Sequence, residues 1–169
     1  MPAEISNFKN SRKTEKIAGD TNSLQLLGSD DEQRKIEEAK ALEKISRNPT
    51  SDTAYLERGN IYLDKGKLDA AISEYKQCIT INPRNYAALF NLALAYYRSK
   101  DLNEALKYYR KARQINPNAP EATLRIADIY YQTGDASNAK FEMNKYLLKN
   151  PKAKADPEIQ KFMNIIGKD

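Results

Sequence analysis

The residue types that most often carry out catalysis are scarce in this sequence of 169 residues. There is no histidine, the side chain that most often acts as a general base or binds a metal. The one cysteine, Cys78, falls at a position that holds a small residue in an internal repeat, so we expect a buried, unreactive thiol. No glycine-rich phosphate loop occurs, and nothing selects a catalytic pair among the 23 acidic residues. The sequence therefore predicts a protein that is not an enzyme and that needs no metal or cofactor.

Composition and charge indicate a folded chain with a solvated surface. Hydrophobic residues make up 40%, and 28 basic residues against 23 acidic ones give a net charge of +5 with mixed signs along the chain. A single cysteine excludes an internal disulfide framework. No window approaches the roughly 18 apolar residues of a membrane span, and the polar N-terminus does not read as a signal peptide. We expect a cytoplasmic protein.

The prolines reveal an internal repeat. Four Asn-Pro pairs recur at intervals of 34 residues, with the prolines at Pro49, Pro83, Pro117 and Pro151. Proline cannot continue a helix, and it also disfavours helical geometry in the residue before it. Four helices are therefore predicted to end at the same phase of the repeat.

Side-chain sizes recur in the same phase. In units that start at Asp52, Tyr86 and Pro120, small residues occupy positions eight and twenty, and large residues occupy positions eleven and twenty-four: Gly59, Ala93, Ala127; Ala71, Ala105, Ala139; Tyr62, Tyr96, Tyr130; Tyr75, Tyr109, Met143. Such alternation suits two closely crossing antiparallel helices. A turn signal at Gly66, Lys100 and Gly134 divides each unit into helix, turn, helix.

This pattern resembles the tetratricopeptide repeat (TPR) family. The middle unit carries its residues most fully: Leu89, Leu92, Ala93, Tyr96, Ala105, Tyr109, Ala112 and Pro117. The resemblance covers residues 52–151 and implies an all-α fold, a right-handed superhelical α-solenoid of three TPR repeats at 52–85, 86–119 and 120–153. Three residues depart from the pattern. Arg58 replaces a leucine, Thr123 replaces a large residue, and Tyr146 stands where Cys78 and Ala112 are small.

Helices are also expected on both sides of the repeats. Residues 30–51 would hold an N-terminal capping helix over 30–47, a degenerate half repeat capped by Ser29 or Asp30, with a stripe of Ile36, Ala39, Leu42 and Ile45. We expect Arg58 to meet Glu38 or Glu43 of that helix, because an unpaired buried charge is costly. Residues 154–169 would hold a C-terminal capping helix, and residues 1–29 a flexible segment that either stays a loose linker or enters a groove.

In this family the first helix of each repeat lines a concave groove. The resemblance implies that the groove binds peptides and that it is lined by Leu56, Asn60, Leu63, Asp64, Phe90, Asn91, Leu94, Tyr97, Arg98, Leu124, Arg125, Asp128, Tyr131 and Gln132. Tyrosine and arginine are favoured at binding hot spots. The alternative is that several of the leucines only pack against a neighbouring helix.

The sequence favours a protein or peptide partner with apolar anchors. Family members that grip a C-terminal carboxylate use two lysines, two asparagines and an arginine. Here Asn60, Asn91 and Arg125 fall at three of those positions, but Leu56 and Glu121 replace the lysines. The predicted function is thus a protein-interaction adaptor with no small-molecule substrate.

Two alternatives remain open at this stage. The first is a structural scaffold that forms homo-oligomers through the apolar face of Ile159, Phe162 and Ile166. The second is binding to nucleic acid or an acidic membrane. It is the less favoured of the two, because seven lysines against four acidic residues over 140–169 make too diffuse an excess.

Overall fold

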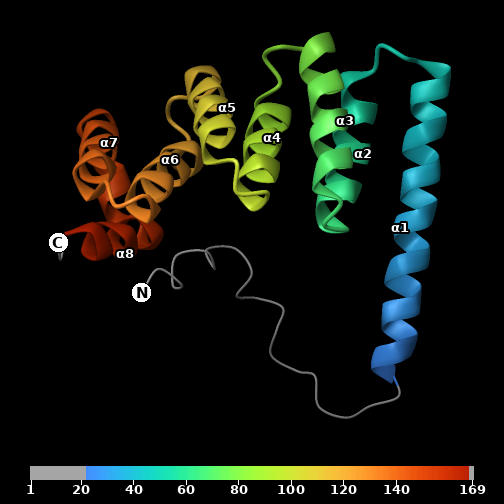
Figure 1. Ribbon diagram of the computed structural model, residues 1–169, viewed down its shortest axis with the longest axis horizontal. Coiled ribbons are helices and arrows are strands. Elements are labelled where there is room, and N and C mark those ends of the chain that lie inside the picture. The colour runs from blue at the N-terminus through green and yellow to red at the C-terminus, as the bar shows by residue number, and fades with distance from the viewer. Residues whose placement is uncertain (1–21, 168–169) are drawn as a thin grey trace. The chain divides into compact units, whose positions relative to one another are not determined.

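The computed structural model describes the backbone of residues 22–167 and the side chains of residues 32–167. Within this range the regular elements are all helices, as predicted, and Figure 1 shows them in chain order. They are α1 (Asn22–Arg47), α2 (Asp52–Asp64), α3 (Leu68–Ile81), α4 (Tyr86–Arg98), α5 (Leu102–Ile115), α6 (Pro120–Gln132), α7 (Ala136–Lys149), the short 3₁₀ helix η1 (Pro151–Ala155) and α8 (Pro157–Ile166). The predicted flexible segment 1–29 falls mostly outside the described residues.

The Asn-Pro pairs end helices as the sequence predicts. Asn82, Asn116 and Asn150 follow the last residues of α3, α5 and α7, with closely similar φ values of −129°, −130° and −128°. Each takes up non-helical geometry because the next residue is proline. Aspartate and serine side chains cap the N-termini of several helices, for example Ser51 at α2 and Asp135 at α7.

The turns between paired helices use a left-handed residue at the predicted place. Gly66 and Gly134 have φ values of 71° and 82°, and Lys100 adopts 68° at the corresponding position of the α4–α5 turn. Glycine takes up this geometry without steric cost, whereas a residue with a Cβ is strained there. The turn geometry is therefore kept even where the sequence lacks the residue that favours it.

By internal contacts, the described residues divide into two compact units, one ending at Ala88 and the other beginning at Leu89. In the first unit, α2 packs against α3 and α1 packs against α2. Gly59 of α2 lies directly under the ring of Tyr75 of α3, and both residues are buried. The small and large positions of the repeat therefore meet here as their sizes suggest.

Adding a methyl group at Gly59 should destabilise the first unit. A Cβ built there would lie 2.5 Å from Cε1 and 2.7 Å from Cδ1 of the fully buried Tyr75 ring. Overpacking costs about 1–3 kcal/mol, against a helix-propensity gain of about 1 kcal/mol for alanine. We expect Gly59→Ala to lower the free energy of unfolding by about 1 kcal/mol in urea denaturation. An increase would show that the ring shifts without strain.

The first helix differs from its prediction at both its start and its packing face. It begins at Asn22 rather than at residue 30, so a cap at Ser29 or Asp30 was a wrong prediction. Ile36 and Leu42 of the predicted stripe are exposed, at 43% and 52%. Ala41 is buried instead, and Glu38 forms an ion pair of 2.5 Å with Lys65 at the end of α2. The helix thus packs through a narrow face made of a small residue and a charged one.

Arg58 also pairs differently from the prediction. Its Nη2 atom lies 2.6 Å from Oε1 of Glu74 on α3, within the helix pair rather than toward α1. Both side chains are largely buried, with exposed fractions of 18% and 10%. The prediction that Arg58 contacts Glu38 or Glu43 was wrong, because α3 supplies a carboxylate from the other side.

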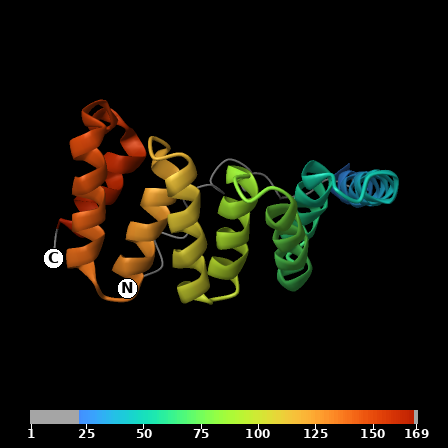
Figure 2. The ribbon, with the colours of Figure 1, turned by 90° about the horizontal axis from the view of Figure 1, so that it is seen from above.

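The second unit is held together by aromatic rings and small residues. Phe90 of α4 meets Tyr109 of α5 edge to face at 5.2 Å, and Tyr96 stacks on Tyr108 at 5.7 Å. Farther along, α6 packs against α7, and α8 contacts both of them (Figures 1 and 2). The burial of α8 side chains against this pair completes the core of the unit.

The apolar face of α8 is used within the chain. Ile159, Phe162 and Ile166 are each 1% exposed or less. An apolar face has to be buried against a neighbour, and α6 and α7 provide one. These three residues therefore offer no open surface to a second copy, and the prediction that they mediate self-association is corrected in favour of a capping role.

Candidate functional site

The predicted groove residues come from α2, α4 and α6. Leu56, Asn60, Leu63 and Asp64 lie on α2 in the first unit, and the remaining ten lie on α4 and α6 in the second unit. Helical spacing places residues three and four apart on one face, which is why each helix contributes several of them. The two groups differ in how far they are exposed.

On α2 the predicted lining is partly structural. Leu63 is buried at 6% exposure, so it belongs to the core rather than to a binding surface. Asn60 accepts a hydrogen bond of 2.8 Å from the hydroxyl of Tyr75 through Oδ1. Leu56 is half-buried and Asp64 is exposed. This helix therefore presents less open surface than the sequence suggested.

On α4 and α6 a polar cluster lies beneath the predicted surface. The hydroxyl of Tyr97 donates a hydrogen bond of 2.9 Å to Oδ2 of Asp128. The amide of Gln132 donates to both carboxylate oxygens of Asp128, at 3.1 and 3.0 Å, and also to the Tyr97 hydroxyl oxygen. Tyr97 and Asp128 are only 8% and 2% exposed. The cluster ties α4 to α6 and fixes the register between the two helices.

Burial controls the ionisation of this cluster. It raises the pKa of Asp128, although hydrogen bonds from Gln132 and Tyr97 and the charge of Arg125 act in the opposite direction. Burial also raises the pKa of Tyr97, and the nearby Asp128 carboxylate adds to that increase. The carboxylate oxygens of Asp128 are already engaged by Tyr97 and Gln132, so this side chain is suited to supporting the surface above it.

Above this cluster lies a mixed surface of partly exposed side chains. Arg98 is exposed, and six predicted residues are half-buried: Phe90, Asn91, Leu94, Leu124, Arg125 and Tyr131. The guanidinium of Arg125 lies 6.0 Å from the centre of the Tyr97 ring, at the edge of cation–π range. We call these seven residues the α4–α6 face. Rigid aromatic and arginine side chains on a fixed helical frame suit contact with another protein.

Sequence reasoning placed Tyr97, Asp128 and Gln132 on the binding surface, but the first two form its support. Two features of the sequence could have indicated this. Gln132 follows Asp128 by four residues, a spacing at which helical side chains meet, and a buried aspartate requires donors. Nothing in the sequence, however, identifies Tyr97 as the donor from another helix.

A metal centre, a reactive thiol and a membrane-spanning helix are not seen in the part of the chain that the structure describes. No group of three or more potential metal ligands gathers there. Cys78 is fully buried, and burial raises the pKa of its thiol to about 11, so it stays protonated and unreactive at neutral pH. No helix among these residues has the length and apolar character to span a bilayer.

Comparisons with known proteins agree with this architecture. Among solved structures, the chain is similar to a crystal structure of MamA, at 24% identity and a TM-score of 0.65, covering 68% of this chain and 67% of that one. A second structure, of MamA protein, matches at 25% identity and a TM-score of 0.64, covering 72% of this chain and 66% of that one. The chain thus spans about two thirds of those proteins. No curated protein matches it.

Family models give the assignment. Two tetratricopeptide repeat models match overlapping stretches, one over residues 56–120 and the other over residues 97–165. Together the matched stretches run from within α2 to within α8, and they include the Asn-Pro ends, left-handed turns and small-to-large contacts described above. The chain belongs to the tetratricopeptide repeat family.

Proposed function

We propose that this protein is a non-enzymatic adaptor and that a partner peptide binds to its α4–α6 face. Family membership and the likeness to MamA indicate a protein-interaction or scaffold module. The observation that carries the finer proposal is the arrangement on α4 and α6, where partly exposed aromatic, amide and arginine side chains rest on the buried Tyr97–Asp128–Gln132 cluster. Such a surface loses little entropy on binding because its frame is already rigid.

The expected ligand is an extended segment with apolar anchors. Phe90, Leu94 and Tyr131 supply apolar area for such anchors, and Asn91 carries both a donor and an acceptor suited to a peptide backbone. Arg125 and Arg98 add positive charge at the same face.

Binding should depend on Arg125 and Tyr131. We expect the Arg125→Ala/Tyr131→Ala double variant to bind peptides selected by phage display on the full-length protein about 30-fold more weakly, a loss of about 2 kcal/mol, in calorimetric titration. Tyr97 is left intact because its removal would disturb the buried cluster and the fold together. Circular dichroism should show unchanged helical content.

The matched control removes the same two residue types elsewhere in the second unit. Arg110 and Tyr130 contact each other, with Nη2 of Arg110 donating to the Tyr130 hydroxyl at 2.5 Å. The Arg110→Ala/Tyr130→Ala variant should bind the selected peptides as the wild type does. Equal affinity of the wild type and the Arg125→Ala/Tyr131→Ala variant would remove this face from the proposal.

Self-association is the second candidate, and it would need a different surface from the one the sequence suggested. On α7, Phe141 and Leu148 are exposed at 59% and 83%, and a spacing of seven residues places them on one side of the helix. Light scattering of the wild type and of Phe141→Ser/Leu148→Ser would test this. A monomeric wild type at high concentration would count against a scaffold built by self-association.

A further inference from the structure

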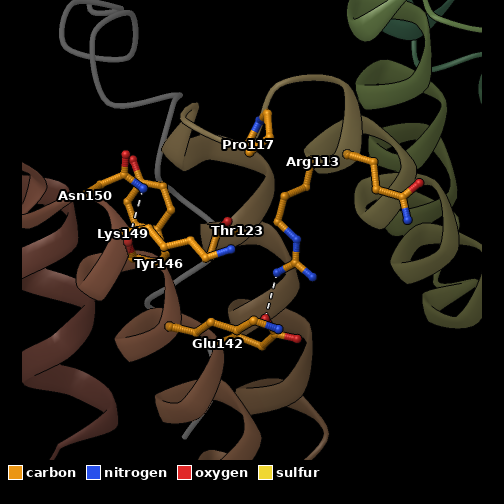
Figure 3. A pocket seen from close by; sticks show the side chains of 9 residues that line it. Arg113, Pro117, Thr123, Glu142, Tyr146, Lys149 and Asn150 are labelled. Carbon is orange, nitrogen blue, oxygen red and sulfur yellow. Dashed lines mark hydrogen bonds and ion pairs between the residues drawn. The ribbon is translucent and has the colours of Figure 1, made fainter.

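A pocket of about 250 Å³ lies in the second unit, apart from the α4–α6 face. Residues near the C-terminal ends of α5 and α7 form its sides, and Thr123 of α6 lies at the centre of the group (Figure 3). The residues lining it are Arg113, Gln114, Pro117, Thr123, Glu142, Lys145, Tyr146, Lys149 and Asn150.

Two departures from the repeat pattern account for the pocket. Thr123 occupies the position at which the first and second repeats have the larger residues Tyr55 and Leu89, so less of the space above α6 is filled. Tyr146 is large where the pattern has a small residue, but its hydroxyl donates a hydrogen bond of 2.9 Å to the backbone carbonyl of Asn118. That bond holds the ring at one wall. The exchange of sizes therefore leaves a hollow instead of a repacked core.

The hydroxyl of Thr123 is the unusual group in this pocket. Its side chain is fully buried, and Oγ1 has no hydrogen-bond partner among the described residues. Threonines in helices or at helix C-caps commonly bond to the carbonyl four residues earlier, as Thr80 does with Lys76 at 2.8 Å and the α6 C-cap Thr133 does with Ile129 at 3.0 Å. A buried hydroxyl without a partner costs about 1–3 kcal/mol. Its position in a pocket indicates that a ligand can supply the missing partner.

The charges around the pocket select the kind of ligand. Arg113 is paired with Glu142, with an N–O distance of 2.7 Å. Lys145 and Lys149 are exposed, and neither forms an ion pair within the described part of the chain. The lining thus carries three cations and one anion, a net excess of two positive charges. A ligand with a negative charge is therefore favoured.

We propose that this pocket binds the carboxylate side chain of an acidic partner peptide, with Lys145 and Lys149 as its counter-ions and the Thr123 hydroxyl as its donor. The volume is below the roughly 300–1,000 Å³ typical of small-molecule sites, so one side chain fits better than a cofactor. The apolar stem of a glutamate would lie against Tyr146 and Pro117. This contact is independent of the α4–α6 face and would give the adaptor a second point of attachment.

The test uses N-acetyl-glutamate methylamide as the probe and N-acetyl-glutamine methylamide as its uncharged control. In amide NMR spectra of the full-length protein, the glutamate probe should shift the signals of Thr123, Tyr146 and Lys149, with a dissociation constant on the order of 1 mM. Equal shifts with the glutamine probe, or shifts only outside the pocket, would overturn the proposal. Displacement of the probe by equimolar inorganic phosphate would assign the pocket to phosphate instead and also overturn it.

Variants separate the pocket from general electrostatics. Thr123→Leu restores the large residue of the repeat and should weaken probe binding at least about tenfold while the protein stays folded. Should that variant misfold, Lys145→Gln/Lys149→Gln serves as the second test and should give a similar loss. Lys140→Gln/Lys154→Gln removes the same total charge outside the lining and should bind the probe normally. Equal losses of probe affinity in the two lysine variants would show that the probe responds only to the overall positive charge, and this outcome would overturn the proposal.

Discussion

Replacing Arg58 with alanine should lower the free energy of unfolding by about 3–5 kcal/mol, the cost of leaving one partner of a buried ion pair unpaired. Glu74 would remain 7% exposed within the α2–α3 pair without its guanidinium. The pKa of Arg58 reflects the balance, since burial acts to lower it but Glu74 raises it above its usual value. Urea denaturation followed by circular dichroism measures the loss.

Most of that loss should come from leaving Glu74 buried without a counter-ion, and little of it from the net stabilisation that the ion pair contributes. Exchanging both partners for similar apolar volume, as in Arg58→Met/Glu74→Met, should leave stability within about 1 kcal/mol of the wild type or increase it. Breaking the exposed Lys44–Glu57 pair by Lys44→Ala should cost no more than about 1 kcal/mol. A double methionine variant as unstable as Arg58→Ala would show that the ion pair itself is indispensable.

Replacing Asp128 with alanine should lower the free energy of unfolding by about 2–3 kcal/mol. The buried Tyr97 hydroxyl would lose its acceptor, and Gln132 would lose both of its carboxylate contacts. Asp128→Asn keeps one acceptor oxygen and should cost about 1 kcal/mol or less at neutral pH. Both values can be read from urea denaturation, and equal losses in the two variants would contradict the role assigned to the hydrogen bonds.

Asp128 should also give the protein a pH-dependent stability of a definite sign. Burial raises its pKa in the folded state above the ordinary value of 3.8, so the folded chain binds this proton more tightly than the unfolded chain. The contribution to stability is fully present below the unfolded value and is lost as pH rises through the folded pKa. The wild type should therefore lose stability relative to Asp128→Asn on going from about pH 4 to neutrality. Parallel profiles would show that the carboxyl group titrates normally.

These predictions distinguish the residues that hold the α4–α6 face in place from the residues that would contact a partner. Tyr97 and Asp128 position the α4–α6 face from beneath, whereas Arg125 and Tyr131 remain available to a partner. A variant of the first pair would alter stability and binding together. A variant of the second pair should alter binding alone, which is why the second pair is the better test of an adaptor role.

The sequence by itself determined where helices end and turn. Asn-Pro stops, the left-handed turn sites and the alternation of small and large residues act within one helix or between adjoining ones. Even the strained turn at Lys100 and the capping helix α8 fall where the 34-residue repeat predicts them. Such signals are local or strictly periodic, so a single chain is enough to identify them.

Only the tertiary structure decided which side chains meet. Arg58 pairs with Glu74 rather than with α1, Tyr97 is buried on Asp128 rather than open to a partner, and Thr123 is left without a hydrogen bond beside a hollow. Each outcome depends on how neighbouring helices rotate about their axes and what volume remains between them. Spacing along one helix does not contain that information, because partners 16 or 31 residues apart are brought together only by packing.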